Sequence, residues 1–125
     1  MRCGVTMTRS PCRGDIVRVR LDPVEGSEQG GDRPGLVISP DFTNRHSPVV
    51  LIAAITSKKT EKIHPFEALI EPSEAGLPQR SKVMLMQLRG LDKRRIIGYY
   101  GRVDGPTMER VDAALRITTG LTRLT

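Results

Sequence analysis

The sequence feature that most restricts the fold is an unbroken apolar run near the middle of the chain, VVLIAAI at residues 49–55. The run is too short for an isolated helix, and its β-branched residues favour a strand that is buried on both faces. Such a strand needs neighbours in a sheet. Shorter apolar or alternating segments predict these neighbours at residues 14–22, 36–39, 65–71, 82–87 and 96–103.

Turn-forming residues separate the predicted strands. Pro34 is best placed at the beginning of the second strand, where its missing backbone donor costs no ladder hydrogen bond. Residues 41–47 predict a turn or one short helical turn, and Gly76 and Pro78 predict a further turn. The loop at 23–32 is long for a simple hairpin, which indicates a functional role.

The clear helical pattern comes last, from Gly105 to about Leu124. Pro106 suits its first turn, and Asp104 or Gly105 can cap it. The predicted buried face carries Met108, Val111, Ala114, Leu115, Thr118 and Leu121. Short strands followed by one amphipathic helix predict a mainly β (α+β) fold, in which a small, strongly bent antiparallel sheet or barrel is closed by the helix.

The length of 125 residues suits one domain with one hydrophobic core. We expect residues 1–12 to be a disordered arm and residues 13–125 to form the domain, because the first dozen residues show no periodicity. The sequence has neither the apolar stretch of a signal peptide nor a run long enough to span a membrane. Two cysteines, Cys3 and Cys12, are too few to form a metal site by themselves. So few cysteines are typical of proteins in a reducing compartment, and we therefore predict a cytoplasmic protein.

The chain is basic, with a formal net charge of +6 at pH 7. A balance of this size favours polyanionic partners, either nucleic acid or an acidic protein tail. It is equally compatible with a charge that only keeps the domain soluble. The net charge therefore limits the classes of possible binding partners but does not identify a function.

Three polar clusters interrupt the apolar pattern, at residues 26–34 (GSEQGGDRP), 56–59 (TSKK) and 87–89 (QLR). Each has a plain structural explanation as a hairpin tip, a strand end or a solvated charge. Arg33 carries the strongest chemical signal, because Pro34 restricts its backbone at a junction between loop and strand. A guanidinium held there stays protonated, can bind two phosphate oxygens, and can stabilise the charge that grows on phosphorus during strand cleavage.

From Arg13 to Leu121 the sequence resembles the MazF/PemK family of toxin endoribonucleases from toxin–antitoxin modules. The matching stretches, in the order expected for the family, are RGDIV from Arg13, GSEQGGDRPGLVIS from Gly26, NRHSP from Asn44, AAITSK from Ala53, HPFE from His64 and VDAAL from Val111. The resemblance implies a compact β-barrel related to SH3-like and CcdB-like toxins, working as a homodimer.

The resemblance also implies an activity. The family cleaves single-stranded RNA at a short sequence without a metal or other cofactor: the ribose 2′-hydroxyl attacks the adjacent phosphate and leaves a 2′,3′-cyclic phosphate and a 5′-hydroxyl. Growth inhibition through mRNA cleavage, and control by an antitoxin with a disordered acidic tail, are implied with it.

The family's catalytic pair falls on Arg33 and Thr56. Arg33 would stabilise charge on the scissile phosphate, and whether it also donates a proton stays open. Thr56 would orient the phosphate or the attacking hydroxyl by hydrogen bonding. The residues predicted to bind RNA are Ser27, Glu28, Gln29, Ser57, Lys58, Gln87 and Arg89.

Three alternatives remain at this point. His46 and His64 could form an acid–base pair of the kind found in other cyclising ribonucleases, since histidine titrates near neutrality. A related toxin barrel could instead poison gyrase, with a function centred on the C-terminal helix. A protein that only binds RNA, or a repressor, could have inherited the same fold without activity.

Overall fold

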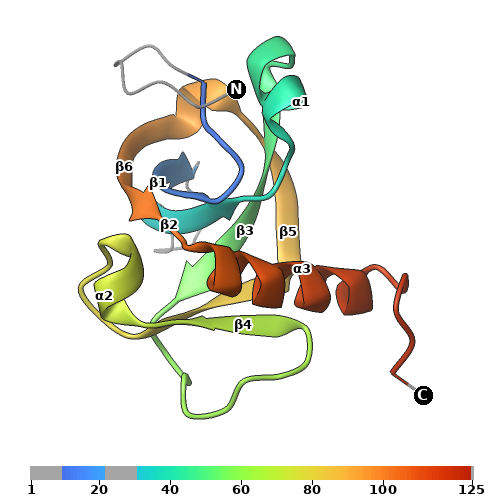
Figure 1. Cartoon of the computed structure of the whole chain (residues 1–125). Coiled ribbons are helices and arrows are strands. Elements are labelled where there is room, and N and C mark those ends of the chain that lie inside the picture. Colours follow the sequence, from blue (N-terminus) through green and yellow to red (C-terminus); the bar gives the residue numbers. More distant parts are fainter. Residues whose placement is uncertain (1–9, 22–30, 125) are drawn as a thin grey trace, which may run out of the picture.

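A computed structural model of the chain describes residues 10–21 and 31–124, apart from the side chains of residues 73 and 74. Its elements follow in the order β1 (Asp15–Leu21), β2 (Gly31–Val37), α1 (Asp41–His46), β3 (Val49–Thr56), β4 (Glu67–Ile70), α2 (Pro72–Ala75), β5 (Ser81–Asp92), the 3-10 helix η1 (Lys93–Arg95), β6 (Ile96–Arg102) and α3 (Gly105–Thr118). In this described part, the six strands form one antiparallel sheet in the order β4-β5-β3-β2-β1-β6 (Figure 1). The apolar run at 49–55 is confirmed as a central strand, between β5 and β2.

Strand β3 has buried side chains on both of its faces, although Val49 and Leu51 in its first half are exposed. Ala53 and Ile55 of β3 pack in a core cluster that also contains Val111 of α3, whereas Val50 and Ile52 pack in a second cluster on the other face. Burial on both faces explains the apolar residues from Val50 onward, but not the exposed Val49 and Leu51. The curvature of the sheet therefore supplies two apolar interiors, and α3 covers only one of them.

The predicted barrel is wrong in one respect, because the sheet is open, with β4 and β6 as its two edges. The sequence pattern did not predict α2 (Pro72–Ala75), which follows β4 and packs against β6 (Figure 1). The contact is close: a Cβ on Gly101 of β6 would lie 2.7 Å from the carbonyl oxygen of Ala75. Helix α2 thus lies between the edge strands β4 and β6, which in a closed barrel would be joined by backbone hydrogen bonds.

Several predicted boundaries also move. Strand β2 begins at Gly31 and runs through Pro34, and β5 extends to Asp92, well past the predicted end. The C-terminal helix is confirmed with Asp104 as its N-cap, whose carboxylate accepts a hydrogen bond of 2.9 Å from the amide of Thr107. It ends at Thr118, so Leu121, predicted on its buried face, is 81% exposed.

The division into an arm at residues 1–12 and a domain at 13–125 stays a prediction, since residues 1–9 lie outside the described part. Residues Pro11 and Cys12 are buried, and the amide of Cys12 donates a hydrogen bond of 2.8 Å to the carboxylate of Asp15. The ordered packing described by the structure therefore begins slightly before Arg13.

We expect Gly76→Ala to lower the free energy of unfolding by about 3 kcal/mol, because it combines backbone strain with a steric clash. Gly76 has a φ of +75°, and a Cβ there would lie 2.2 Å from the carbonyl oxygen of Tyr100. Gly120→Ala is the matched control, with a φ of +82° and nothing within 4 Å of the added Cβ, and should cost about 1 kcal/mol. Urea denaturation measures both losses. If both variants lost the same free energy of unfolding, the contact of α2 with β6 would not contribute to stability.

Candidate functional site

The site begins where β2 and β3 separate. The last paired residues of the two strands are Gly35 and Ala54. Arg33 and Thr56 each lie two residues beyond this last pair, one on each of the separating strands. Both residues line a cavity of about 440 Å³ that opens at this point.

The separation of the strands also accommodates Pro34. This residue is opposite Arg18 of β1 but lies beyond the last pair between β2 and β3. Strand β2 is therefore paired on one side only there, and a proline that cannot donate a ladder hydrogen bond is tolerated at such a position. Its ring also restricts the backbone of Arg33.

The first cavity, which we call the apolar cavity, has a hydrophobic floor and a polar rim. The floor consists of side chains from β1, β3 and β5: Val19, Leu21, Ile52, Ala54, Ile55, Met84, Leu88 and Leu91. Besides Arg33 and Thr56, its polar lining residues are Gln87 and Arg89 of β5, both exposed. A flat apolar ring with polar edges would fit this lining.

A second cavity of about 520 Å³, the polar cavity, adjoins the first. The two share Arg33, Pro34, Ile55 and Thr56, so Arg33 and Thr56 stand at the boundary between them. The other lining residues come from the start of β2, the loop after β3, the segment that leads into β5, and β6. They are Asp32, Ser57, Lys58, Leu77, Pro78, Gln79, Ser81 and Tyr100.

The hydroxyl of Thr56 is held in a turn. Its Oγ1 accepts a hydrogen bond of 3.1 Å from the amide of Lys58. A hydroxyl that already accepts a bond in this way still has its proton to donate. The next residue, Lys59, adopts a φ of +56°, which turns the chain sharply beyond Lys58. The arrangement orients a donor, Thr56, beside a cation at the same cavity.

A buried ion pair lies next to Thr56 in the sheet. Lys82 of β5 is the register partner of Thr56, and its Nζ donates 2.9 Å to Oε1 of Glu67 and 3.2 Å to the carbonyl oxygen of Lys62. The two charged side chains are only 6% and 8% exposed. Glu67 also accepts a hydrogen bond of 3.0 Å from the amide of His64. The pair therefore ties the far end of the loop that follows Thr56 to the sheet.

Burial alone would raise the pKa of Glu67, but hydrogen bonds from the amide of His64 and the ammonium group of Lys82 outweigh it and lower the pKa. Glu67 is thus held as the charged partner of Lys82 at neutral pH. The sequence prediction missed this pair, although a lysine within the alternating apolar segment 82–87 was a usable signal.

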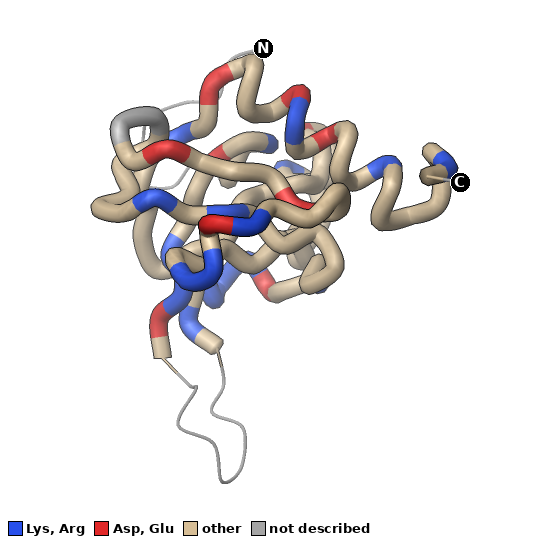
Figure 2. Tube along the Cα trace, turned by 90° about the horizontal axis from the view of Figure 1, so that it is seen from below, with Lys and Arg blue, Asp and Glu red and all other residues tan. Residues whose placement is uncertain are grey.

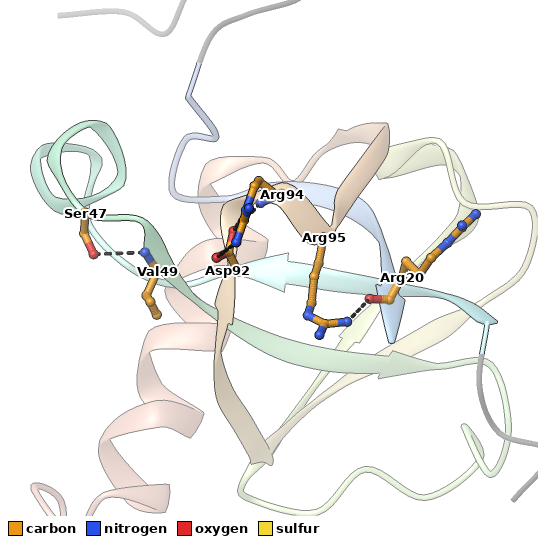
Figure 3. Close-up of polar contacts among 6 residues, drawn as sticks. All are labelled: Arg20, Ser47, Val49, Asp92, Arg94 and Arg95. Carbon is orange, nitrogen blue, oxygen red and sulfur yellow. Dashed lines mark hydrogen bonds and ion pairs between the residues drawn. The ribbon is translucent and has the colours of Figure 1, made fainter. Parts of the chain in front are cut away.

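Basic residues surround the edge of the site where β1 ends and β2 begins. Lys and Arg positions gather there in the trace (Figure 2). Asp32 is 3.9 Å from Arg18 and 3.6 Å from Arg20, and these exposed pairs contribute little to stability. The side chain of Arg95 donates 3.2 Å to the carbonyl oxygen of Arg20 (Figure 3), which places a further cation beside β1.

Farther along the same surface, Arg94 neutralises an acidic group. Its Nε and Nη2 donate 3.0 Å and 3.1 Å to the two carboxylate oxygens of Asp92 (Figure 3). These bonds, with a third from the backbone amide of Arg94, lower the pKa of Asp92 to about 2. Asp92 thus stays charged and paired, so this acidic group does little to repel a polyanion approaching the basic edge.

The structure brings six of the nine predicted site residues around the two cavities: Arg33, Thr56, Ser57, Lys58, Gln87 and Arg89. The other three, Ser27, Glu28 and Gln29, lie outside the described residues. Gln79, Ser81 and Tyr100 were not among the predicted site residues. They come from segments far from Arg33 in the sequence, and no motif connects them.

The two histidines lie apart from both cavities. The ring of His46 is 4.6 Å from that of Phe42 between centroids, and the ring of His64 is stacked at 5.1 Å on that of Phe66. Neither histidine lines either cavity. The geometry therefore gives the histidine-pair alternative no support.

Within residues 10–21 and 31–124, no group of three or more His, Cys, Asp and Glu residues is placed to hold a metal ion. In the same part of the chain, none of the helices combines the length and the apolar character needed to cross a membrane.

Comparison with known proteins decides the family. Residues 12–119 match the family described as the PemK-like, MazF-like toxin of type II toxin–antitoxin systems. The chain belongs to the PemK/MazF toxin family. The match spans the strands, both cavities and α3, so the resemblance seen in the sequence is confirmed.

Relatives of this PemK/MazF chain agree with the assignment. Endoribonuclease EndoA of Bacillus subtilis (strain 168) is 40% identical over 109 residues, which cover 87% of this chain and 94% of that relative. A MazE–MazF structure from Deinococcus radiodurans is similar with a TM-score of 0.74 and 28% identity, covering 90% of this chain and 98% of that one. An endoribonuclease in complex with its cognate antitoxin, from a mycobacterial species, has a TM-score of 0.75 at 25% identity, covering 91% and 99% of the two chains.

Proposed function

We propose that this PemK/MazF chain is the toxin of a toxin–antitoxin system and acts as a sequence-specific endoribonuclease on single-stranded RNA. The observation that carries the proposal is the position of Arg33 and Thr56 at the boundary between two adjoining cavities. We infer that one phosphodiester lies at this boundary, with its two nucleotides on either side. The name of the Bacillus relative, an endoribonuclease, supports the same activity.

The proposed reaction needs no metal. The 2′-oxygen of one ribose forms a bond to the adjacent phosphorus while the bond from phosphorus to the 5′-oxygen of the next nucleotide breaks. The 2′-hydroxyl proton leaves to a base, and the departing 5′-oxygen takes up a proton, giving a 2′,3′-cyclic phosphate and a 5′-hydroxyl. Arg33 stabilises the charge on the phosphoryl oxygens, and the hydroxyl of Thr56 donates a hydrogen bond to one of them or orients the 2′-hydroxyl.

The remaining predicted residues are proposed to hold the RNA. Ser57 and Lys58 would bind it in the polar cavity, and Gln87 and Arg89 in the apolar cavity. The proposal keeps Ser27, Glu28 and Gln29 as further RNA contacts. Cations at the rim attract the phosphate backbone without regard to sequence, whereas amide groups such as that of Gln87 can read base edges.

The proposal also includes partners and location. Large apolar side chains of Val49, Leu51 and Met86 are exposed on β3 and β5, and a homodimer would bury such surface.

An antitoxin with a disordered acidic tail suits the basic surface of the toxin. The RNA substrate places the activity in the cytoplasm, where cleavage of mRNA would stop translation and growth.

The test of the function is an end-mapping assay. The purified full-length protein is incubated with a mixed RNA in the presence of a chelator, and the 5′ ends and end groups of the fragments are mapped. We expect cuts at a recurring short sequence, with 5′-hydroxyl ends. RNA that stays intact under all conditions, or cuts without any shared sequence, would refute the proposal.

We expect Thr56→Val to lower the rate of cleavage about a hundredfold, because valine keeps the shape of threonine and removes the donor aimed at the phosphate. The measurement is the single-turnover rate on a short RNA. Thr118→Val, which removes a hydroxyl from α3 outside both cavities, serves as the control. If the rate of Thr56→Val falls only in step with its melting temperature, Thr56 has a structural role.

A further inference from the structure

We propose that the polar cavity is the subsite for the base of one nucleotide beside the scissile phosphate, and that Tyr100 and Gln79 select that base. This inference rests on the proposed function. Both residues line the cavity that shares Arg33 and Thr56 with the apolar cavity. An RNA strand whose phosphodiester lies at this boundary must direct one of its two neighbouring nucleotides toward the polar cavity.

The size and the lining of the polar cavity suit a nucleotide. Its volume of about 520 Å³ lies within the range found for small-molecule sites. Lys58 supplies a positive charge near the boundary, where the sugar–phosphate backbone would pass. The lining therefore combines the cations of Arg33 and Lys58 with neutral polar groups and the ring of Tyr100. It also contains the carboxylate of Asp32, which is paired with Arg18 and Arg20.

Tyr100 packs against the core cluster that contains Val111 and also lines the polar cavity, where we infer that its ring serves as a stacking surface. Its side chain is half-buried, and its carbonyl lies so close to Gly76 that a Cβ there would come within 2.2 Å. The C-terminal end of α2 thus packs directly against the backbone of Tyr100. Single-stranded RNA is commonly recognised by unstacked bases that lie on such aromatic rings.

Gln79 offers hydrogen bonds to the edge of the stacked base. Its exposed side-chain amide carries donors and an acceptor together, which is the pattern that reads adenine when both bonds form. The turn that carries it is held in place, since the hydroxyl of the buried Ser81 donates 2.9 Å to the carbonyl oxygen of Gln79. Stacking by one residue and edge recognition by the other together define a base-selective subsite.

The test compares cleavage-site preferences of the full-length protein and its variants on a randomised RNA, by sequencing the 5′ ends. We expect Tyr100→Ala and Gln79→Ala each to reduce discrimination about tenfold at a single position on one side of the cut. Tyr100→Phe, which keeps the ring, should retain the preference. Tyr99→Ala removes an equivalent ring from β6 outside both cavities and should leave every position unchanged.

Each outcome separates the inference from the proposed function. If the unchanged protein cuts no RNA, the proposed function fails and the inference fails with it. If it cuts RNA but Tyr100→Ala and Gln79→Ala keep all preferences, or lose activity equally on every sequence, the inference alone is wrong. Preferences that stay intact while binding of the antitoxin weakens would assign the cavity to a protein partner and also overturn the inference. Gln79 is exposed, so its variant keeps the test valid if Tyr100→Ala fails to fold.

Discussion

Arg33→Ala is expected to lower the rate of RNA cleavage about a thousandfold while leaving the protein folded. The guanidinium is the group at the boundary of the two cavities best able to offset charge on a pentavalent phosphorus. Its side chain is exposed near the start of β2, so truncating it opens no void in either core cluster. The loss should therefore appear in the single-turnover rate and not in the melting temperature.

Two further variants sharpen this experiment. Arg33→Lys keeps a positive charge but loses the two-pronged geometry, so its rate should fall between those of the unchanged protein and Arg33→Ala. Arg20→Ala removes an exposed arginine that lies outside both cavities, and should weaken RNA binding only slightly and mainly at low salt. An Arg33→Ala protein that retained nearly full activity would show that the site has been misassigned.

Lys82→Met is expected to lower the free energy of unfolding by about 4 kcal/mol, because it leaves the carboxylate of Glu67 buried without its partner. The double variant Lys82→Met, Glu67→Met should recover most of this loss, since two well-packed apolar side chains can replace a buried ion pair at little cost. The measurement is urea denaturation at a fixed protein concentration, which keeps any dimerisation constant.

The control for the buried pair is an exposed one. Arg80 lies 3.9 Å from Glu71, and about half of each side chain is exposed. Arg80→Met should therefore cost less than about 1 kcal/mol. If Lys82→Met were no worse than Arg80→Met, the buried pair would not be what holds the loop after Thr56 against the sheet.

The pair also predicts a dependence on pH. The pKa of Glu67 is lower in the folded protein than in the unfolded chain, where a glutamate has a pKa of about 4.3. A lowered pKa stabilises the fold above the unfolded value, and this contribution is lost as the pH falls through the folded value. The stability difference between the unchanged protein and Glu67→Gln should therefore shrink below about pH 4. A difference that stayed constant down to pH 2 would contradict this.

The strands themselves could be predicted because their signals are local. The apolar run of β3 has no reasonable alternative to a buried strand, and Asp104 and Pro106 mark the start of α3. The pairing of strands depends on distant contacts, however. Only the pairing of β2 with β3, and the cavities that open beyond it, bring Arg33 and Thr56 to one site, and alternation within each strand does not encode it.

The open edge of the sheet and the polar cavity could not be predicted from the sequence, because they also depend on contacts between residues that are far apart in the chain. The helix α2 lacks the length for a periodic pattern, and its place against β6 depends on Gly76 fitting beneath the carbonyl of Tyr100. Gln79 and Tyr100 are separated by the whole of β5, so no spacing rule connects them. Lys82 stood out in the sequence as a charge in an apolar segment, but its partner Glu67 became apparent only in the folded sheet.

The most direct test of the central claim uses an RNA with a single 2′-deoxy substitution at the nucleotide that precedes the cut. If Arg33 and Thr56 hold a phosphodiester for attack by the neighbouring 2′-hydroxyl, this RNA should bind with nearly unchanged affinity and remain uncut, while the all-ribose RNA yields a 2′,3′-cyclic phosphate and a 5′-hydroxyl. Cleavage of the substituted RNA at an undiminished rate would contradict the account.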